Sequence, residues 1–466
     1  MAGVIDHPLI QLVNQIVART RPVDEQARIK QRLFDIVLYI KRVEGHELTR
    51  EEKDFITHHK LGMWDFAPSK ELAEGLRDRI RIIDEYQIES AFRIHEMLEY
   101  GFEITSSRTL TTSQVSILQE LVKDPMMNVS QLSRRLGNSR NFITKSLREM
   151  EEHFALRRTY VANRGKLKFT LFSLFFRTKS FNESKALESW VHKSTPLFHT
   201  TLVFDVTFRN GILGFAIPSQ QRAHRLFERR VRRLEQQYFE RTHLHKGLEQ
   251  YWNIRFDNYD SNTGQWLIPF EFENLYEFQA SNQTKSVALT YCSYADLREA
   301  AYFDHIDLLL TRAKINVKNT IADIQSYLSQ YHYNLSHNAI SQRLARLREE
   351  EVIFPHLYFS GAGIEEFIAL SIICNSKTQK ELQLLASYFP LSFTYITQQG
   401  ITIFVKRPTG WREFFTKFIH DLPSVFDIQE LMVVYQERNY GSGLRDPVYN
   451  RWNEKRQYWE FRETEI

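Results

Sequence analysis

The same order of helices and strands occurs twice along this chain of 466 residues, and that repetition constrains the fold more than any other feature. Residues 112 to 256 predict three short helices, followed by a strand-helix-strand-strand-helix-strand succession. Residues 305 to 435 predict the same succession at an offset of roughly 190 to 200 residues, which indicates an internal duplication rather than a solenoid. The sequence therefore predicts an α+β fold with two similar units in tandem.

The three short helices of the first unit have the pattern of a winged helix-turn-helix. The first begins near Thr112, the second runs from Asn128 to Gly137, and the third begins at Ser139. The apolar residues expected on the buried side of the third helix are Phe142, Ile143, Leu147 and Met150. Leu156 to Thr170 then predicts a two-stranded wing with its turn at Asn163-Arg164-Gly165.

The strands and helices that follow each helix-turn-helix have the order of a ferredoxin-like domain. The expected domains are a helical N-terminal region (1–102), a first winged helix-turn-helix (103–166), a first ferredoxin-like domain (167–256), a linker (257–300), a second winged helix-turn-helix (301–363), a second ferredoxin-like domain (364–438) and a C-terminal tail (439–466). An apolar stripe from Leu72 to Ile88 packs either on the next domain or on a second copy of the chain. A homodimer through the N-terminal helices or the ferredoxin-like sheets belongs to the second alternative.

Cations gather where a helix-turn-helix contacts DNA, although the whole chain carries an excess of only 61 − 57 = 4 positive charges. The segment from Ala155 to Thr170 holds five cations and no acidic residue, which suits phosphate contact. Polar side chains begin the third helix, where recognition helices meet base edges. The predicted DNA-binding residues are Ser139, Arg140, Asn141, Thr144, Lys145, Arg157, Arg158, Arg164, Lys166 and Lys168. The alternative is a solvated basic hairpin on a domain that binds protein.

The second helix-turn-helix has less positive charge than the first for contact with a phosphate backbone. Its expected wing, Val352 to Glu366, contains no Lys or Arg, and its third helix, Ser336 to Glu350, ends in acidic residues. We expect this unit to be mainly architectural, stabilising a pseudo-dimer or presenting a protein-binding face. Direct DNA contact is the alternative.

Two features outside the helix-turn-helix segments carry candidate chemistry. Arginines alternate with apolar residues from Ser219 to Gln237, which predicts a helix with a basic outer face. That face contacts phosphate, docks an acidic partner, or is only a solvated surface with local ion pairs. His243 and His245 share one face of an expected strand, but no third metal ligand is assignable, so a structural role is favoured.

The order of elements resembles the leucine-responsive and asparagine-synthetase regulators, the Lrp/AsnC family of prokaryotic transcription factors. The residues that carry the resemblance are Ile117-Leu118-Gln119-Glu120-Leu121, Val129-Ser130-Gln131-Leu132-Ser133-Arg134-Arg135-Leu136-Gly137 and Ala339-Ile340-Ser341-Gln342-Arg343-Leu344-Ala345-Arg346-Leu347. It implies sequence-specific binding of double-stranded DNA in transcription regulation. An adaptor function, in which the N-terminal helices bind the transcription machinery or another protein, can coexist with DNA binding. Family members usually carry one unit per chain and pair by symmetry, so this chain would imitate a dimer. Their Gly-Asp-aromatic-Asp effector loop is not matched by Phe208-Arg209-Asn210-Gly211 or Gln398-Gln399-Gly400.

Enzymatic and membrane patterns are weak in this sequence. No nucleophile elbow or phosphate-binding loop occurs, and Cys292 and Cys374 lack the surroundings of an activated thiol. The low cysteine count and the absence of a long apolar run predict a cytoplasmic protein with no membrane contact. We expect no enzymatic activity, no cofactor and no metal. Two alternatives stay open: an adaptor that binds protein through its winged helices, and an enzyme similar in fold to siroheme decarboxylases, using His243, His245 and the arginines between Arg222 and Arg233 around a tetrapyrrole carboxylate.

Overall fold

The computed structural model confirms an α+β fold. It describes residues 7–21, 23, 26–53, 70–85, 87–89, 94, 109–154, 156–194, 199–205, 209–268, 290–293, 302–315, 320–359, 361–408, 411–439 and 451–462. The chain divides into two compact units, the first comprising 1–104, 185–195 and 439–442, and the second comprising 105–184, 196–438 and 443–466. The two units are treated separately below.

The first compact unit is helical. It contains α1 (Leu9–Arg19), α2 (Gln26–Val43) and α4 (Lys70–Glu85), which contact one another pairwise. Leu76, Ile80 and Ile83 of the predicted stripe are buried there, so packing within the chain covers this part of the stripe. Ile88 of the stripe is buried as well, whereas Tyr86 and the side chain of Leu72 lie outside the described residues.

Capping residues position the helices of the first helix-turn-helix, α6 (Thr112–Lys123), α7 (Val129–Leu136) and α8 (Arg140–His153). Thr111 and Asn128 each form a capping box with the residue three positions later, and Gly137 ends α7 with a φ of 69°, a left-handed conformation that favours glycine. The second helix-turn-helix consists of α12 (His305–Ile315), α13 (Ile321–Ser329) and α14 (His337–Glu349). Both sets of helices begin close to the positions predicted.

Eight strands form two sets of four with the same internal order. The first half contains β2 (Phe169–Thr178), α9 (Phe181–Ser194), β3 (His199–Asp205), β4 (Asn210–Pro218), α10 (Gln221–Tyr238) and β5 (Phe239–Ile254). The second half contains β10 (Ile364–Cys374), α15 (Ser376–Ala386), β11 (Leu391–Thr397), β12 (Gly400–Pro408), α16 (Arg412–Val425) and β13 (Ile428–Asn439). The strand orders are β3-β4-β2-β5 and β11-β12-β10-β13, as expected for ferredoxin-like domains. The duplication itself and the domain boundaries stay predictions.

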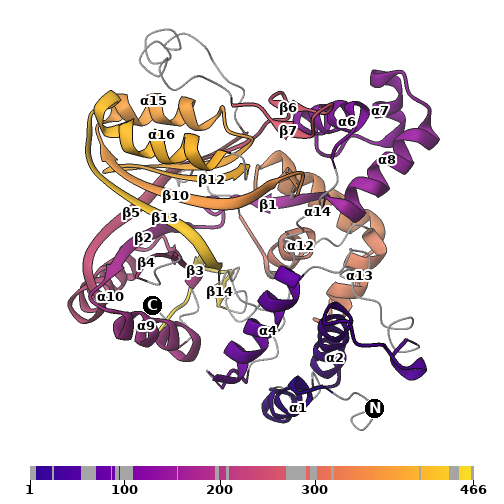
Figure 1. Ribbon diagram of the computed structural model, residues 1–466, viewed down its shortest axis with the longest axis horizontal. Coiled ribbons are helices and arrows are strands. Elements are labelled where there is room, and N and C mark those ends of the chain that lie inside the picture. The colour runs from indigo at the N-terminus through magenta and orange to yellow at the C-terminus, as the bar shows by residue number, and fades with distance from the viewer. Residues whose placement is uncertain are drawn as a thin grey trace. The chain divides into compact units, whose positions relative to one another are not determined.

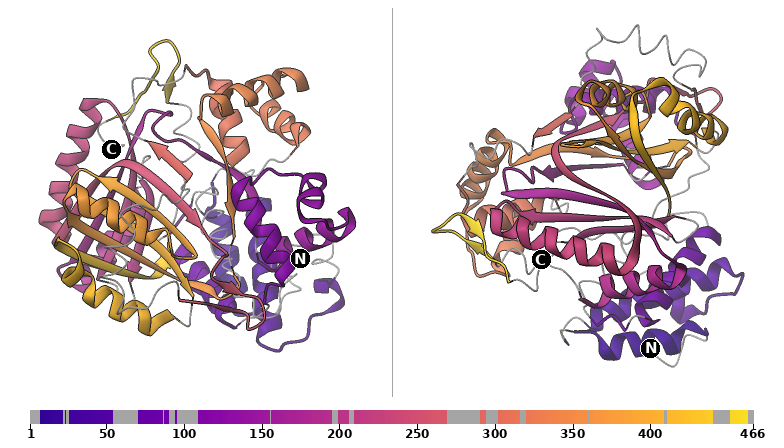
Figure 2. Two further views of the ribbon diagram at one scale, coloured as in Figure 1. Left: turned by 90° about the horizontal axis from the view of Figure 1, so that it is seen from above. Right: turned by 90° about the vertical axis from the view of Figure 1, so that its left-hand side faces the viewer.

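The two halves join through their strands. β13 lies beside β3 and β5 pairs with β11, so the eight strands follow one another around a closed circuit, with β8 (Thr290–Ser293) added beside β5. Figure 2 shows the two layers of strands between helices, with α15 and α16 over the second half and α10, labelled in Figure 1, over the first. Phe175, Phe404, Met432 and Val434 belong to an apolar cluster shared by both halves. The interior is therefore built jointly.

The predicted wing hairpins are wrong. β1 (Arg157–Ala162) does not pair with β2. It pairs along its whole length with β9 (Ile353–Tyr358), the strand that follows the second helix-turn-helix. Residues 163–168 form consecutive turns, with Leu167 N–H donating to Asn163 O over 3.1 Å, and β2 then enters the large sheet. A turn that redirects the chain in this way cannot close a hairpin, so the two helix-turn-helix segments share one two-stranded ribbon (Figure 1).

Two small hairpins fall in segments predicted to be a linker and an irregular tail. They are β6 (Tyr259–Asp260) with β7 (Gln265–Trp266), and β14 (Trp452–Asn453) with β15 (Tyr458–Trp459). Trp266 Nε1 donates to Ala362 O and Trp459 Nε1 donates to Leu167 O, both over 2.7 Å. Each buried indole thus holds the turn that precedes β10 or β2. The predicted linker residues 269–289 and 294–300 lie outside the described residues.

We predict that Trp459→Ala lowers the free energy of unfolding by about 3 to 5 kcal/mol, because it removes a buried ring and a hydrogen bond at once. Trp459 stacks on Phe169 with 4.6 Å between ring centroids. Urea denaturation followed by circular dichroism measures the change. Lys455→Ala, an exposed change in the same hairpin, is the control. A loss below about 1 kcal/mol for Trp459→Ala contradicts the anchoring role.

Candidate nucleic-acid interface

The beginning of α8 presents a polar, cationic face to solvent. Ser139 caps the helix, its Oγ accepting a hydrogen bond from Phe142 N–H over 3.2 Å. Arg140, Asn141, Thr144 and Lys145 are all exposed. No acidic residue occurs between Ser139 and Arg148. The structure thus brings together the five residues predicted on this helix.

The third helix of the second helix-turn-helix, α14, provides an internal comparison for α8. Ser336 caps α14 as Ser139 caps α8, so positions can be matched by counting from the cap. The matched pairs are Arg140 and His337, Asn141 and Asn338, Thr144 and Ser341, Lys145 and Gln342, and Arg148 and Ala345. The first helix has three permanent cations at these positions and the second has none. Only α8 therefore combines base-edge donors and acceptors with phosphate-binding charge on this face.

The predicted wing cations do not form one surface. Arg157 is exposed at the start of β1, whereas Arg158 Nη1 donates to Met127 O over 3.4 Å and its guanidinium lies 3.9 Å from the Glu151 carboxylate. Arg164 and Lys166 are half-buried in the turns before β2. Lys168 Nζ donates to Gln457 O over 2.8 Å, and burial lowers the pKa of its ammonium group. Lys168 thus stabilises contact with the C-terminal hairpin.

Two residues of α8 differ from the predicted set. The sequence places Arg148 on the outward side of the helix but the DNA-binding prediction omits it, and the structure shows that it continues the exposed face one turn beyond Thr144 and Lys145. Phe142, assigned to the buried side, is 41% exposed. It lies in the first turn of α8, where the buried face begins, so its ring is only partly covered. It adds an apolar contact point beside the polar face.

The basic residues of α14 serve the second helix-turn-helix internally. Arg343 Nη1 lies 2.7 Å from Asp304 and 2.8 Å from Asp307, and Arg346 also pairs with Asp307. Burial raises the pKa of the Asp307 carboxyl, and the neighbouring Asp304 charge adds to that effect. The arginines stabilise the ionised form against this cost. They are held against α12 and its N-terminus.

His243 and His245 lie in one chain of hydrogen bonds that crosses the two halves of the sheet. Ser371 Oγ is 2.8 Å from His243 Nδ1 and 2.7 Å from His245 Nε2. The chain continues from His245 Nδ1 to Thr397 Oγ1 over 3.1 Å and from His243 Nε2 to Glu430 over 2.9 Å. With both imidazoles neutral, His245 Nε2–H donates to Ser371 Oγ, the Ser371 hydroxyl donates to His243 Nδ1, and His243 Nε2–H donates to the Glu430 carboxylate. The single hydroxyl proton of Thr397 is shared between His245 Nδ1 and Gly400 O, which lies 2.8 Å from Thr397 Oγ1. All four ring nitrogens then have partners, which is the structural role that the sequence favoured.

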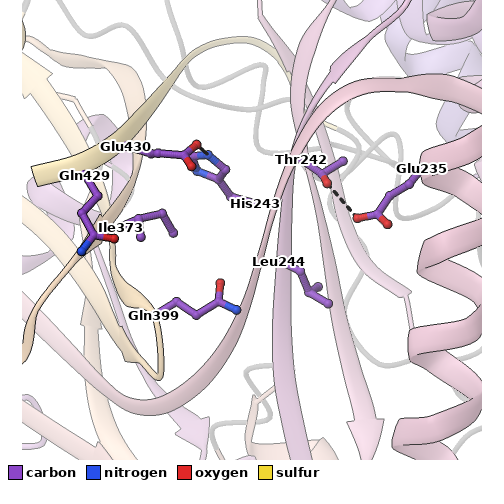
Figure 3. A pocket seen from close by; sticks show the side chains of 8 residues that line it. All are labelled: Glu235, Thr242, His243, Leu244, Ile373, Gln399, Gln429 and Glu430. Atoms are coloured by element: carbon purple, nitrogen blue, oxygen red, sulfur yellow. Dashed lines mark hydrogen bonds and ion pairs between the residues drawn. The ribbon is translucent and has the colours of Figure 1, made fainter.

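Burial keeps these imidazoles neutral. It lowers the pKa of His245 to about 3 and also lowers the pKa of His243. Figure 3 shows a cavity of about 520 Å³ beside His243, lined by Glu235, Thr242, His243, Leu244, Ile373, Gln399, Gln429 and Glu430. Its charged lining residues are carboxylates, and none of the arginines of α10 lines it. The structure therefore does not gather the predicted tetrapyrrole-binding residues into this cavity.

Comparisons with known proteins give only distant likenesses. No family model matches the chain, and no curated protein matches it. Two crystal structures of the siroheme decarboxylase NirDL, one in complex with an iron-uroporphyrin III analogue, are 11% identical, with TM-scores of 0.38 and 0.37, and cover 71% of this chain and 93% of theirs. The crystal structure of PH0061 is 14% identical, with a TM-score of 0.23, covering 30% and 93%. At these TM-scores the likenesses carry no argument about function.

No group of three or more His, Cys, Asp or Glu side chains among the described residues is placed to hold a metal ion. None of the described helices has both the length and the apolar character needed to cross a membrane. Cys374 is a buried free thiol whose pKa is raised to about 12 by burial, so it is a poor nucleophile.

We predict that His245 makes the protein less stable as the pH falls from 6.5 toward 3. The unfolded imidazole takes up a proton near its ordinary pKa of 6.5, whereas the folded one does not until the pH is close to 3. His245→Asn should therefore flatten the pH dependence of the unfolding free energy by up to about 1.4 kcal/mol per pH unit between pH 6 and 5. Urea denaturation across that range measures the slope, with His420→Asn, a largely exposed site, as the control. Equal slopes in all three proteins would refute the prediction.

Proposed function

We propose that this protein binds double-stranded DNA through α8 and regulates transcription. The observation that carries the proposal is the exposed face of α8, where Arg140, Asn141, Thr144, Lys145 and Arg148 lie together. The first acidic residue of the helix, Glu149, comes only after them and lies 3.8 Å from the Lys145 ammonium group. Duplex DNA requires donors and acceptors for base edges together with cations for phosphates, and this face has both. Homodimerisation and contact with the transcription machinery stay predictions.

Base contacts and phosphate contacts come from different residues of α8 and β1. Arg140, Asn141 and Thr144 lie in the first turns of a recognition helix, the part that meets base edges in the major groove. Lys145 and Arg157 supply positive charge for phosphates, and Arg164 and Lys166 stay predicted contributors. In the second helix-turn-helix, the ion pairs of Arg343 and Arg346 with Asp304 and Asp307 support an architectural role. We propose that this unit contributes mainly the shared ribbon and sheet.

A tetrapyrrole enzyme is the second candidate, favoured by the location of His243 at the cavity of Figure 3. Two features weigh against it. His243 and His245 use both ring nitrogens in hydrogen bonds, so neither offers a free ligand. Glu235 and Glu430 would also repel the carboxylates of such a ligand. We therefore propose a binding protein without enzymatic activity.

We predict that Asn141→Ala weakens binding to a selected DNA site by roughly 5- to 100-fold and relaxes its preference at one base position. Arg157→Ala should instead weaken binding to all sequences and reduce the salt dependence by about one phosphate contact. Site selection from a random duplex library, followed by fluorescence anisotropy across a salt series, separates the two effects. Asn338→Ala, the matched change in α14, is the control and should alter neither property. An equal effect of Asn141→Ala and Asn338→Ala would count against α8 as the DNA-contacting helix.

We predict that iron-uroporphyrin III added to the purified protein shows no saturable Soret shift that depends on His243. Both imidazole nitrogens are occupied in the folded chain, so coordination would require the hydrogen-bond chain to break. The measurement is an absorbance titration of the wild-type protein and of His243→Gln. A saturable shift that is lost in His243→Gln would favour the enzymatic candidate over the DNA-binding one.

A further inference from the structure

The helix α10 has one apolar face and one arginine-rich face. Ala223, Phe227, Val231 and Leu234 are buried, and the helix contacts β4 and β5. The exposed arginines are Arg222, Arg225, Arg229, Arg232 and Arg233. Their spacing of three, four and seven residues places them along one side of the helix. The stripe from Arg222 to Arg233 is about 16 Å long at a rise of about 1.5 Å per residue.

The positive charge of four of the five exposed arginines of this stripe is not neutralised by an ion pair within the described part of the chain. The six arginines and two glutamates of α10 give a net charge of 6 − 2 = +4, equal to the net charge of the whole chain. Arg225, Arg229, Arg232 and Arg233 form no ion pair with any residue in the described part of the chain. Burial lowers the pKa of Arg230, and the charge of Arg233 lowers it further, as expected for cations that repel one another.

The fold does not require these arginines. α16 occupies the place of α10 in the second half, after the third strand and before the fourth. Its cations Arg412 and Lys417 are balanced by Glu413 and Asp421, a net charge of 2 − 2 = 0. Mutual repulsion among the arginines of α10 costs stability that α16 avoids. Such a cost is typical of a surface that binds an anion.

We propose that the arginine stripe of α10 binds the phosphate backbone of duplex nucleic acid without regard to sequence. Its cations are all arginines, whose planar guanidinium donates two parallel hydrogen bonds to a phosphate. A protein partner would require apolar anchors, yet the exposed large apolar side chains among the described residues include none from α10. The same absence of exposed rings removes the stacking platform that single strands use.

The stripe is a second contact, separate from α8. Figure 1 shows α10 at the left of this compact unit and α8 at the right, on either side of the strands. One long or bent duplex, or two separate duplexes, could therefore contact both surfaces. The stripe covers about five base pairs at a rise of about 3.4 Å per pair. This inference goes beyond recognition by α8 and does not depend on it.

The test compares two triple variants of the full chain that each remove three exposed cations. One is Arg225→Gln, Arg229→Gln and Arg232→Gln; the matched control is Lys377→Gln, Lys380→Gln and Lys417→Gln on α15 and α16. Fluorescence anisotropy with duplexes of about 15 and about 60 base pairs across a salt series gives the affinity and the salt slope. Circular dichroism melting checks that both variants fold.

We predict that the arginine variant binds the 60-base-pair duplex at least tenfold more weakly, with the absolute salt slope reduced by about two to three. The lysine variant should bind like the wild type. An Asn141→Ala variant should relax the sequence preference at one base position but keep the contribution of α10 to the slope. Equal binding by wild-type protein and arginine variant on the long duplex overturns the proposal, whatever α8 does. Arginine-dependent binding of poly-glutamate with unchanged duplex binding would overturn it in favour of an acidic protein partner.

Discussion

Backbone pairing between strands that are far apart in the sequence holds the second compact unit together. β1 pairs with β9, β5 with β11 and β13 with β3, and each pair joins one half of the unit to the other. Without the pairing of β5 with β11 and of β13 with β3, the edge strands of both four-stranded sets would leave backbone N–H and C=O groups without partners. The shared apolar cluster around Phe175 and Phe404 depends on the same closure. Neither half would bury its interior alone.

Local features of the fold could be predicted from the sequence, and long-range pairing could not. Helix starts at Thr111, Asn128 and Ser139 follow from side chains that cap their own helix, so nearby residues contain the information. The wing hairpin was wrong because the partner of β1 lies in the second unit, and a turn at Asn163 looks the same in either case. The hairpin that carries Trp459 was missed because strands of two residues have no periodicity.

In the candidate site, too, local features could be predicted from the sequence and long-range contacts could not. The polar residues of α8 lie together because one helix presents them, so their spacing was sufficient. The cations of the supposed wing were grouped by sequence proximity alone, and the structure separates Arg157 at the surface from Lys168 at the C-terminal hairpin. His243 and His245 were correctly paired on one face, but Ser371 and Glu430, which hold them, come from strands whose position no local pattern indicates.

The two halves share a framework and differ in the surfaces that can bind a ligand. α8 has cations where α14 has none, and α10 has unpaired arginines where α16 is balanced. The imidazoles of His243 and His245 also have no counterpart: in the register of the two sheets, Phe175 faces His243, whereas Ser371 of the second half faces Met432. In a symmetric dimer, both subunits would carry the same charged or imidazole side chains. Both would therefore bear the cost of these side chains in charge repulsion or desolvation. Within one chain, one half can carry the charged surfaces while the other supplies the strands that complete the sheet. This separation of roles is the physical basis for proposing nucleic-acid contact in the first half, at α8, β1 and α10.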